Sequence, residues 1–379
     1  MIPFNKPYLT GKETTYITEA VASGKISGNG IFTKKCQHLF EEKFNIKKAL
    51  LTTSCTDALE MAAILINIQE GDEVIMPSYT FVSTANAFVL RGAKIIFADS
   101  YKDNPNIDPD KIEELITSKT RAIVPVHYAG VACDMDKIMV IAKKNNLFVI
   151  EDAAQAVDSY YKGRALGSIG HLAAFSFHET KNIISGEGGL LAINDEQFID
   201  RSEIIWEKGT NRSAFFRGDV NKYGWVDIGS SFLPSEIIAA FLWAQIENIE
   251  NIQTKRKNIW NYYNQEFLKV STKNRAITTP FIPDYATNNA HMYYLVCNNI
   301  TERTELIEHL INSDISSVFH YLSLHKSVFY KNKHDGRNLL HCDKFGDCLI
   351  RLPLFYELKN VDQELIIHEI KRFFNKQDR

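Results

Sequence analysis

The chain has 379 residues, 45% hydrophobic and 23% charged, which is enough for one large globular domain and a smaller one. Its 43 basic and 46 acidic side chains give a net charge of −3, which argues against nucleic acid or an anionic membrane as the main partner. Without a signal-peptide pattern, a membrane-spanning run or a C-x-x-C pair, we expect a cytoplasmic protein with no disulfide framework and no metal site.

The first half of the chain predicts a helix-wrapped sheet. Helical patterns at 11–23 and 32–44 come first, separated by a glycine-rich loop at 23–30. Short apolar runs then alternate with helical segments such as 136–144. The strand-like runs cover 47–53, 73–76, 94–98, 122–126 and 147–150. Such alternation is typical of an α/β fold with a mostly parallel sheet.

The first of these strands leads into a helix whose start is rich in small polar residues. Ser54 and Asp57 are common N-cap residue types, and Cys55 and Thr56 lie between them. The free N–H groups and the dipole at such a helix start can hold a phosphate group. Plain helix capping, without a ligand, is the alternative interpretation.

A single lysine lies between two apolar runs further along the chain. Residues 172–177 and 190–193 are predicted strands, and the segment between them contains Lys181 and glycines at 186, 188 and 189. The glycines favour a tight return of the chain rather than a helix. A lysine at the edge of an apolar pocket loses hydration, which lowers its pKa and makes it a usable nucleophile. A solvated loop lysine is the alternative.

The carboxyl ends of parallel strands meet at one edge of a sheet, where ligands gather. The polar and aromatic residues expected at that edge are Ser54, Thr56, Tyr79, Phe81, His127, Tyr128, Glu151, Asp152, Ser176 and Lys181. A lysine, a carboxylate, a phosphate-binding helix start and an aromatic ring are the groups that a pyridoxal phosphate site requires. Each of them also has a purely structural interpretation; Asp152, for example, could simply cap a helix.

The second half of the chain predicts a smaller α+β domain. Residues 201–234 form a long segment with little periodicity, and segments of that length are usually functional or lie at an interface. A long amphipathic helix at 235–268 is expected to cross to the smaller domain. That domain has predicted strands at 292–296 and 318–320 and helices at 301–312 and 362–374. We expect domains at 1–250 and 251–379.

Four segments, in this order, resemble the DegT/DnrJ/EryC1/StrS sugar aminotransferases over nearly the whole chain. They are TSCTDAL at 53–59, PSYTFVSTAN at 77–86, EDAAQ at 151–155, and FSFHETKN at 175–182 with GEGG at 186–189. Within the family, the resemblance is greatest to the dTDP-4-amino-4,6-dideoxygalactose transaminases of enterobacterial common antigen synthesis. The segments MIPFN at 1–5, VPVHYAGVAC at 124–133, EKGTNR at 207–212 and RLPLFY at 351–356 indicate this.

The resemblance implies the aspartate aminotransferase fold and a role for each matching residue. Lys181 would form the Schiff base with pyridoxal phosphate, and Asp152 would face the pyridine nitrogen. Gln155 would contact the ring hydroxyl and Phe81 would stack on the ring. The phosphate would be held by Ser54, Cys55 (through its N–H), Thr56 and Ser176. Where many relatives have an asparagine that reaches the phosphate of a neighbouring subunit, this chain has Ser231.

The resemblance also implies the reaction. Glutamate would give its amino group to the cofactor, with pyridoxamine phosphate as the intermediate, and a dTDP-linked 4-keto-6-deoxyglucose would receive it. Lys181 would move the proton in both halves of the reaction. The expected assembly is a homodimer with shared active sites. Candidate contacts to the sugar nucleotide are Lys208, Arg212 and Arg217, with His320, Tyr321 and His325 near the sugar. The alternatives are a solvated or subunit-interface loop for the three cations and a structural role for the histidines.

Other functions are compatible with parts of this pattern. Some family members carry histidine at the Schiff-base position and remove a sugar hydroxyl, which Lys181 argues against. Other members give the gluco epimer, a 3-amino sugar or a GDP-linked product, and the cofactor motifs do not separate these. A nicotinamide-dependent dehydrogenase would need G-x-G-x-x-G after the first strand, where this chain has SCTD. A non-catalytic binding protein on the same fold need not keep Lys181.

Overall fold

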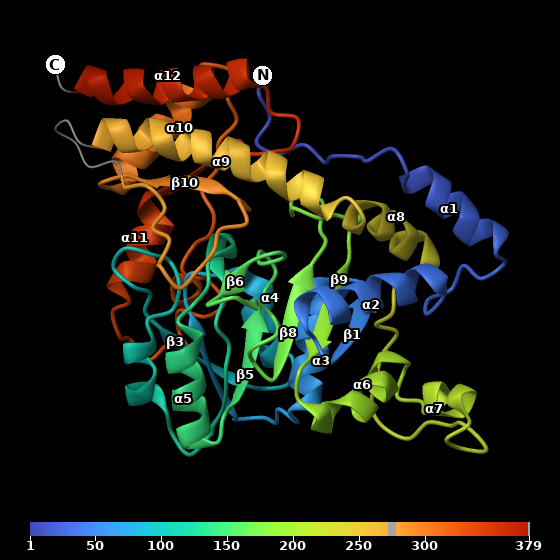
Figure 1. Cartoon of the computed structure of the whole chain (residues 1–379). Coiled ribbons are helices and arrows are strands. Elements are labelled where there is room, and N and C mark those ends of the chain that lie inside the picture. The colour runs from blue at the N-terminus through green and yellow to red at the C-terminus, as the bar shows by residue number, and fades with distance from the viewer. Residues whose placement is uncertain (272–277, 378–379) are drawn as a thin grey trace.

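The computed structural model describes residues 1–271 and 278–377 (Figure 1). The α-helices in these residues are α1 (Glu13–Ala22), α2 (Ile31–Phe44), α3 (Cys55–Leu65), α4 (Val82–Val89), α5 (Met135–Asn145), α6 (Ile199–Trp206), α7 (Arg212–Arg217), α8 (Glu236–Ile246), α9 (Ile249–Ser271), α10 (Ile300–Ile311), α11 (Leu340–Cys348) and α12 (Asn360–Gln377).

A seven-stranded sheet forms the centre of the molecule, in the order β1-β9-β8-β5-β4-β2-β3. Its strands are β1 (Lys48–Thr52), β2 (Glu73–Pro77), β3 (Lys94–Ala98), β4 (Thr120–Ile123), β5 (Phe148–Asp152), β8 (Leu172–Ser176) and β9 (Gly189–Ile193). Only β9 runs against its neighbours, so the sheet is mostly parallel, as the sequence predicts. Two-stranded sheets pair β6 (Tyr160–Tyr161) with β7 (Arg164–Ala165), and β10 (Tyr293–Val296) with β11 (Leu349–Leu352).

Successive residues of each central strand face opposite sides of the sheet and enter two different hydrophobic clusters. In β8, Ala173 and Phe175 pack with residues of α2, α5 and α8, whereas Leu172 and Ala174 pack with residues of α3, α4 and α6. Because both faces are covered, the strand interiors are mostly apolar, and the charged residues lie at or near the strand ends.

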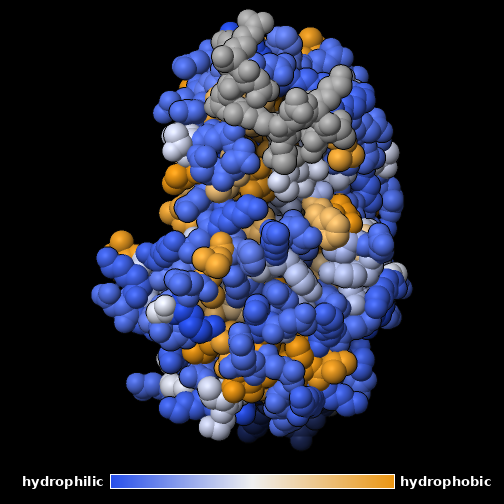
Figure 2. Space-filling model, turned by 90° about the vertical axis from the view of Figure 1, so that its left-hand side faces the viewer, coloured by the Kyte–Doolittle hydropathy of each residue, from blue (hydrophilic) through white to orange (hydrophobic). Residues whose placement is uncertain are grey.

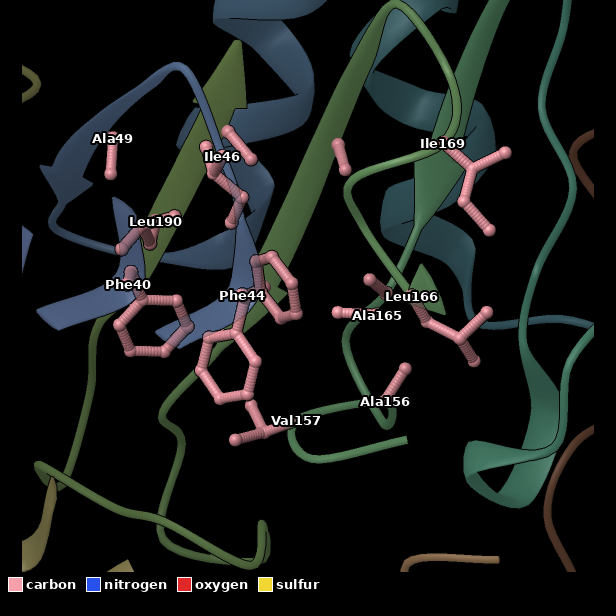
Figure 3. Close-up of a cluster of buried hydrophobic side chains, with 14 of the residues drawn as sticks. Phe40, Phe44, Ile46, Ala49, Ala156, Val157, Ala165, Leu166, Ile169 and Leu190 are labelled. Atoms are coloured by element: carbon pink, nitrogen blue, oxygen red, sulfur yellow. The ribbon is translucent and has the colours of Figure 1, made fainter. Parts of the chain in front are cut away.

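Aromatic packing supports the strand that precedes Lys181. The ring of Phe40, on α2, meets the rings of Phe175 and Phe177 edge-on, with centroids 5.4 and 5.6 Å apart. Figure 3 shows Phe40 and Phe44 beside Leu190 of β9. Edge-to-face pairs of this kind contribute about 0.5–1.5 kcal/mol each beyond the area that they bury. The residues just before the lysine segment are therefore held in a close-packed core.

A third cluster lies outside the central sheet, where α9, α10 and α12 pack around β10 and β11. Figure 1 shows these elements together at one end of the molecule, with α9 leading toward them from α8. The first residues of the chain also start there, because Ile2 forms a β-bridge with Ile315. The predicted division at residue 250 falls at the start of α9, but the chain N-terminus lies with the second group of elements.

Three expectations about secondary structure are wrong. The helix expected at 235–268 is two helices, because the Asn248 side chain donates to the carbonyl of Ala244 at 3.0 Å and α8 ends there. At 318–320 there is no strand: Val318 makes an isolated bridge to Arg351, after which the chain turns away. The segment 201–234 is partly helical, since α6 runs to Trp206, whose indole N–H donates to the Leu51 carbonyl at 2.6 Å.

The described surface is mostly polar. Figure 2 shows one face on which hydrophilic side chains predominate and hydrophobic ones form small separate groups. Among the helices of residues 1–271 and 278–377, none combines the length and hydrophobicity needed to span a bilayer.

Candidate active site

Lys181 lies on the connection between β8 and β9. Ser176 pairs with Gly189 where these strands end, so the chain leaves and re-enters the sheet at one point. The Lys181 N–H donates to the His178 carbonyl at 2.8 Å. Loss of hydration lowers the pKa of the Lys181 amine; the charge of Arg351 lowers it further, whereas Cys55 and Asp152 act in the opposite direction. The amine is thereby shifted toward its neutral, nucleophilic form.

Asp152 ends β5, the strand next to β8, and its carboxylate is buried. One oxygen accepts a hydrogen bond from the Thr84 hydroxyl at 2.7 Å, and the other accepts from the Ala154 N–H at 3.1 Å. Thr84 in turn lies 2.9 Å from the hydroxyl of Thr80. A buried carboxylate held at both oxygens keeps a fixed position, as a partner for a ring nitrogen requires.

Gln155 is also fixed by the protein. Its Oε1 accepts from the Ala129 N–H at 2.6 Å, and its Nε2 donates to the Tyr321 hydroxyl at 3.1 Å. Tyr321 therefore links the second group of elements to the segment after β5. The ring of Phe81, 53% exposed at the start of α4, lies 5.6 Å from the Tyr321 ring. The structure thus brings Gln155, Tyr321 and Phe81 together.

The start of α3 lies directly beside Gly189. Ser54 caps the helix, because its hydroxyl accepts from the Asp57 N–H at 3.1 Å, a contact type that stabilises a helix by about 1 kcal/mol. A Cβ on Gly189 would stand 2.4 Å from the Cys55 nitrogen, so only glycine lets the strand approach the helix start so closely. Burial raises the pKa of the Cys55 thiol, which therefore stays neutral. Thr56 donates to Ser83 at 2.8 Å.

These residues fit pyridoxal phosphate by their chemistry. Lys181 offers an amine of lowered pKa, and Asp152 offers a fixed, buried carboxylate at the adjacent strand end. The first turn of α3 offers backbone N–H groups, and the buried Ser176 offers a hydroxyl where β8 meets Gly189. An amine, a carboxylate and an anion-binding helix start are the three kinds of group that this cofactor needs.

The candidate sugar contacts differ in how they are held. The His320 carbonyl accepts from the hydroxyls of Tyr79 at 2.5 Å and Tyr128 at 3.1 Å, so the His320–Tyr321 segment rests on two buried phenols. His325 is buried instead: its Nδ1 lies 2.8 Å from the Ser78 hydroxyl, and its Nε2 lies 3.5 Å from Asp343. Tyr321 thus lies against the cofactor candidates Gln155 and Phe81, whereas His325 is held as a structural histidine.

Lys208, Arg212 and Ser231 lie on an exposed part of the chain. Lys208 donates its N–H to the Ser230 carbonyl at 3.0 Å, and Arg212 begins α7, where its guanidinium lies 5.1 Å from the Phe216 ring. Figure 1 shows α7 at the edge of the molecule, at the opposite end from α12. Among residues 1–271 and 278–377, no hydrogen bond or ion pair joins α7 to the segment of Lys181. Arg217 is paired with Glu203 and Asp219 among the described residues.

Sequence reasoning did not single out three residues that the structure places at this site. Thr84 holds Asp152, and His291 has its Nδ1 2.9 Å from the Asn182 side chain, next to Lys181. Arg351 lies on the short strand β11 and is 7% exposed. The sequence does contain a clue to Arg351, because it is a charged residue inside the otherwise apolar run 349–352. A charged side chain in a buried strand often has a functional role.

The comparisons with known proteins agree with this geometry. Residues 7–371 match the DegT/DnrJ/EryC1/StrS aminotransferase family. The chain belongs to this family. It is 32% identical to GDP-perosamine synthase from Escherichia coli O157:H7, with 99% of each chain covered. It is 31% identical to the spore coat polysaccharide biosynthesis protein SpsC of Bacillus subtilis, with 98% of this chain and 96% of SpsC covered.

A solved structure gives the same result for the fold. Spr1654 from Streptococcus pneumoniae, a proposed sugar aminotransferase solved in its PMP form, superposes with a TM-score of 0.90 at 26% identity. The comparison covers 99% of this chain and 100% of Spr1654. The aspartate aminotransferase-like α/β fold and the pyridoxal phosphate cofactor predicted from the sequence are therefore confirmed. The protein is a sugar aminotransferase of this family.

Proposed function

We propose that the protein transfers the amino group of glutamate to C4 of a dTDP-linked 4-keto-6-deoxyglucose, giving dTDP-4-amino-4,6-dideoxygalactose. The observation that supports the transamination is the juxtaposition of Lys181, of lowered pKa, with the buried Asp152 at the next strand end. A histidine at position 181 would favour removal of a sugar hydroxyl instead. The choice of dTDP and of this sugar depends on the resemblance of the segments at 1–5, 124–133, 207–212 and 351–356.

We assign the roles as follows. Lys181 and Asp152 are the catalytic residues. When bound, the cofactor would supply an electron-accepting ring, and the negative charge of the fixed Asp152 carboxylate would stabilise the protonated form of its ring nitrogen. Cofactor contacts would come from Ser54, Cys55, Thr56, Phe81, Gln155, Ser176 and, across a subunit boundary, Ser231.

Lys181 carries the protons. Its Nζ takes the proton from the α-carbon of glutamate in the first half of the reaction, and it delivers a proton to the sugar carbon in the second. The face from which Nζ approaches determines the configuration at C4. Because the β8–β9 connection is fixed at both ends by paired strands, Lys181 would approach every bound sugar from the same direction.

A GDP-linked keto sugar is a second candidate substrate. It is favoured by the relatives named GDP-perosamine synthase, at 32% and 33% identity. Both candidates require the same cofactor residues, so they differ only in the contacts to the nucleotide and sugar. Lys208, Arg212, His320 and Tyr321 are the residues that we propose for these contacts. His325 is left out, because its two ring nitrogens lie against Ser78 and Asp343.

One experiment separates the two candidates. The purified holoenzyme is incubated with glutamate and either dTDP-4-keto-6-deoxyglucose or a GDP-linked 4-keto-6-deoxy sugar, and the configuration of the product at C4 is assigned by NMR. We expect the axial amino sugar on dTDP. Amination of the GDP-linked sugar alone, or an equatorial product, would contradict the proposal. The Lys181→Ala variant is the control for non-enzymatic amination.

We also propose that the active protein is a homodimer with shared sites. The support is the exposed apolar surface of the segment that follows α6: Trp225 is 84% exposed and Phe216 is 69% exposed. Large exposed aromatic residues gathered on one segment are typical of an interface. Ser231, on the same segment, would then face the phosphate of the other subunit. Light scattering, with Trp225→Ser as the comparison variant, tests the assembly.

A further inference from the structure

A buried amide lies between the segments that carry Gln155 and Lys181. It belongs to Asn289, which is fully buried just before β10, in the second group of elements. Its Nδ2 donates to the carbonyls of Gln155 at 2.8 Å and Val157 at 2.9 Å, and its Oδ1 accepts from the His291 N–H at 3.0 Å. Both N–H groups and the oxygen of the amide are therefore paired, which fixes its orientation.

Asn289 is also bonded to the residue that follows Lys181. The buried side chain of Asn182 donates from Nδ2 to the Asn289 carbonyl at 2.8 Å and to Oε1 of Gln253, on α9, at 2.8 Å. Its Oδ1 lies 2.9 Å from His291 Nδ1. Because Nδ2 faces two acceptors, Oδ1 must accept from the histidine ring, whose proton is therefore on Nδ1. Loss of hydration lowers the pKa of His291, so the ring stays neutral.

Two hydrogen bonds in series thus join the two segments. The first runs from Asn289 Nδ2 to the Gln155 carbonyl, and the second runs from Asn182 Nδ2 to the Asn289 carbonyl. Gln253 adds a longer bond, from its Nε2 to the same Asn289 carbonyl at 3.4 Å. Buried polar groups are costly to leave unpaired, so this network resists any change in the spacing between Gln155 and Lys181.

A glycine makes room for the amide. Gly130 has a φ of +76°, and a Cβ on it would stand 2.0 Å from Asn289 Oδ1. The residue before it, Ala129, donates its N–H to Gln155 Oε1 at 2.6 Å. This turn and Asn289 therefore hold Gln155 together, the turn at its side chain and Asn289 at its backbone carbonyl.

We propose that Asn289 is a positioning residue for transamination, because it sets the position of Gln155 relative to Lys181 by bonding to the segment of each. The proposal rests on the aminotransferase function and on the roles assigned above to these two residues. In those roles they contact neighbouring substituents of one ring, the hydroxyl and the aldehyde carbon. A change in their spacing would therefore turn the ring, and a misplacement of about 1 Å can lower a rate by about 100-fold.

A buried amide elsewhere in the second group provides a control. Gln363, on α12, is buried, and its Nε2 donates to the Ile259 carbonyl of α9 at 2.6 Å. This bond joins two helices of the second group and touches neither Gln155 nor Lys181. Gln363→Leu therefore removes a buried amide bond without changing the spacing of those two residues.

The first test measures the glutamate half-reaction of the holoenzyme, without any sugar, in Asn289→Ala, Asn182→Ala and the double variant. We expect each single variant to lower the rate by about 10- to 100-fold while the KM for glutamate changes less than about threefold. Because the two bonds act in series, removing either one breaks the connection. The double variant should thus lose clearly less than the product of the two single losses. Gln363→Leu should keep the wild-type rate. Losses that multiply would overturn the inference.

A pair of glycines tests the same point without removing any bonding group. Gly130→Ala presses on Asn289, whereas Gly163, with a φ of +80°, has no atom within 4 Å of its added Cβ. Both substitutions strain the backbone in a similar way, so Gly163→Ala is the matched control. We expect Gly130→Ala alone to lower the rate of the half-reaction. Equal rates in the two variants would contradict the role of Asn289, and this comparison stands even if Asn289→Ala does not fold.

A second measurement does not depend on turnover. Visible circular dichroism of the bound cofactor, per mole bound at saturating pyridoxal phosphate, reports how the ring is held. We expect a partial loss of this signal in Asn289→Ala and Gly130→Ala but not in Gln363→Leu or Gly163→Ala, with thermal unfolding to measure any common loss of stability. A signal unchanged in all four variants would overturn the inference. An error in the proposed sugar affects neither measurement, whereas a wild type without any cofactor signal would contradict the aminotransferase function itself.

Discussion

The segment around Lys181 and the segment around α7 differ in what holds their side chains. Asp152 has both carboxylate oxygens bonded inside the protein, and Gln155 has both ends of its amide bonded. In the α7 region, by contrast, Arg212 is exposed, and so is most of Trp225. Residues of the first kind are positioned by the single chain. Exposed residues such as Arg212 and Trp225 take a defined position only when they contact a ligand or a second subunit.

This difference predicts which kinetic constant a substitution should change. Substitutions near Lys181 should lower kcat, whereas substitutions in the α7 region should raise the KM for the substrate. A group held by buried hydrogen bonds should determine the reaction, because the chain itself fixes its position. An exposed segment determines which substrate is bound, because its contacts form only when that substrate or a partner arrives. The following predictions test this division, from the largest expected effect to the smallest.

Replacement of Lys181 by Ala should have the largest effect. In the proposed mechanism this change removes both the amine that holds the cofactor and the group that moves the protons, so turnover should fall by about 10⁴-fold or more. The measurement is amino-sugar formation from glutamate, with circular dichroism as the control for folding. Activity near that of the wild type would remove the basis of the site assignment.

Asp152→Asn should lower kcat by roughly 10²- to 10³-fold, because it removes a preorganised charge while keeping the size of the side chain. Thr84→Val is the matched variant: it removes the hydrogen bond to Asp152 but keeps the carboxylate. The expected loss for Thr84→Val is about tenfold, the effect of one hydrogen bond to a charged group. Both variants are compared by their kcat in steady-state assays. An equal kcat for Asp152→Asn and Thr84→Val would show that the charge of Asp152 does not contribute to catalysis.

Gly189→Ala should destabilise the protein and weaken cofactor binding. The added Cβ would stand 2.4 Å from backbone atoms of Ser54 and Cys55, so the start of α3 must move. We expect a loss of about 1–3 kcal/mol in the free energy of unfolding, the usual result of overpacking a core. Gly224→Ala is the control, because its Cβ would meet no atom within 4 Å. Chemical denaturation and pyridoxal phosphate titration of both variants check this.

Arg212→Ala should have the smallest effect on chemistry and act on the sugar alone. We expect the KM for the nucleotide sugar to rise about tenfold, the effect of one lost charge-assisted hydrogen bond, with the glutamate half-reaction unchanged. Arg217→Ala should change KM less, because Arg217 is already neutralised by Glu203 and Asp219. A fall in the rate of the glutamate half-reaction in Arg212→Ala would break the division between the two regions.

Much of the large sheet and its site could be predicted from local pattern. The strand runs, the helix start at Ser54 and the glycine-rich return after Lys181 each depend on a few neighbouring residues, and the structure contains all three. The break between α8 and α9 could not be predicted, because the apolar periodicity continues across it. It depends on one side chain, Asn248, which bonds to a carbonyl one turn earlier.

What the sequence by itself determined is the type of fold, the family and the residues suited to hold the cofactor, since these follow from patterns that are short and contiguous. Only the tertiary structure decided which distant residues meet. It placed Thr84 on Asp152, Tyr321 on Gln155, and Arg351 in a small pocket with Thr180. The physical reason is that burial and pairing of a polar group are set by the elements that pack around it, and those lie far away in the chain.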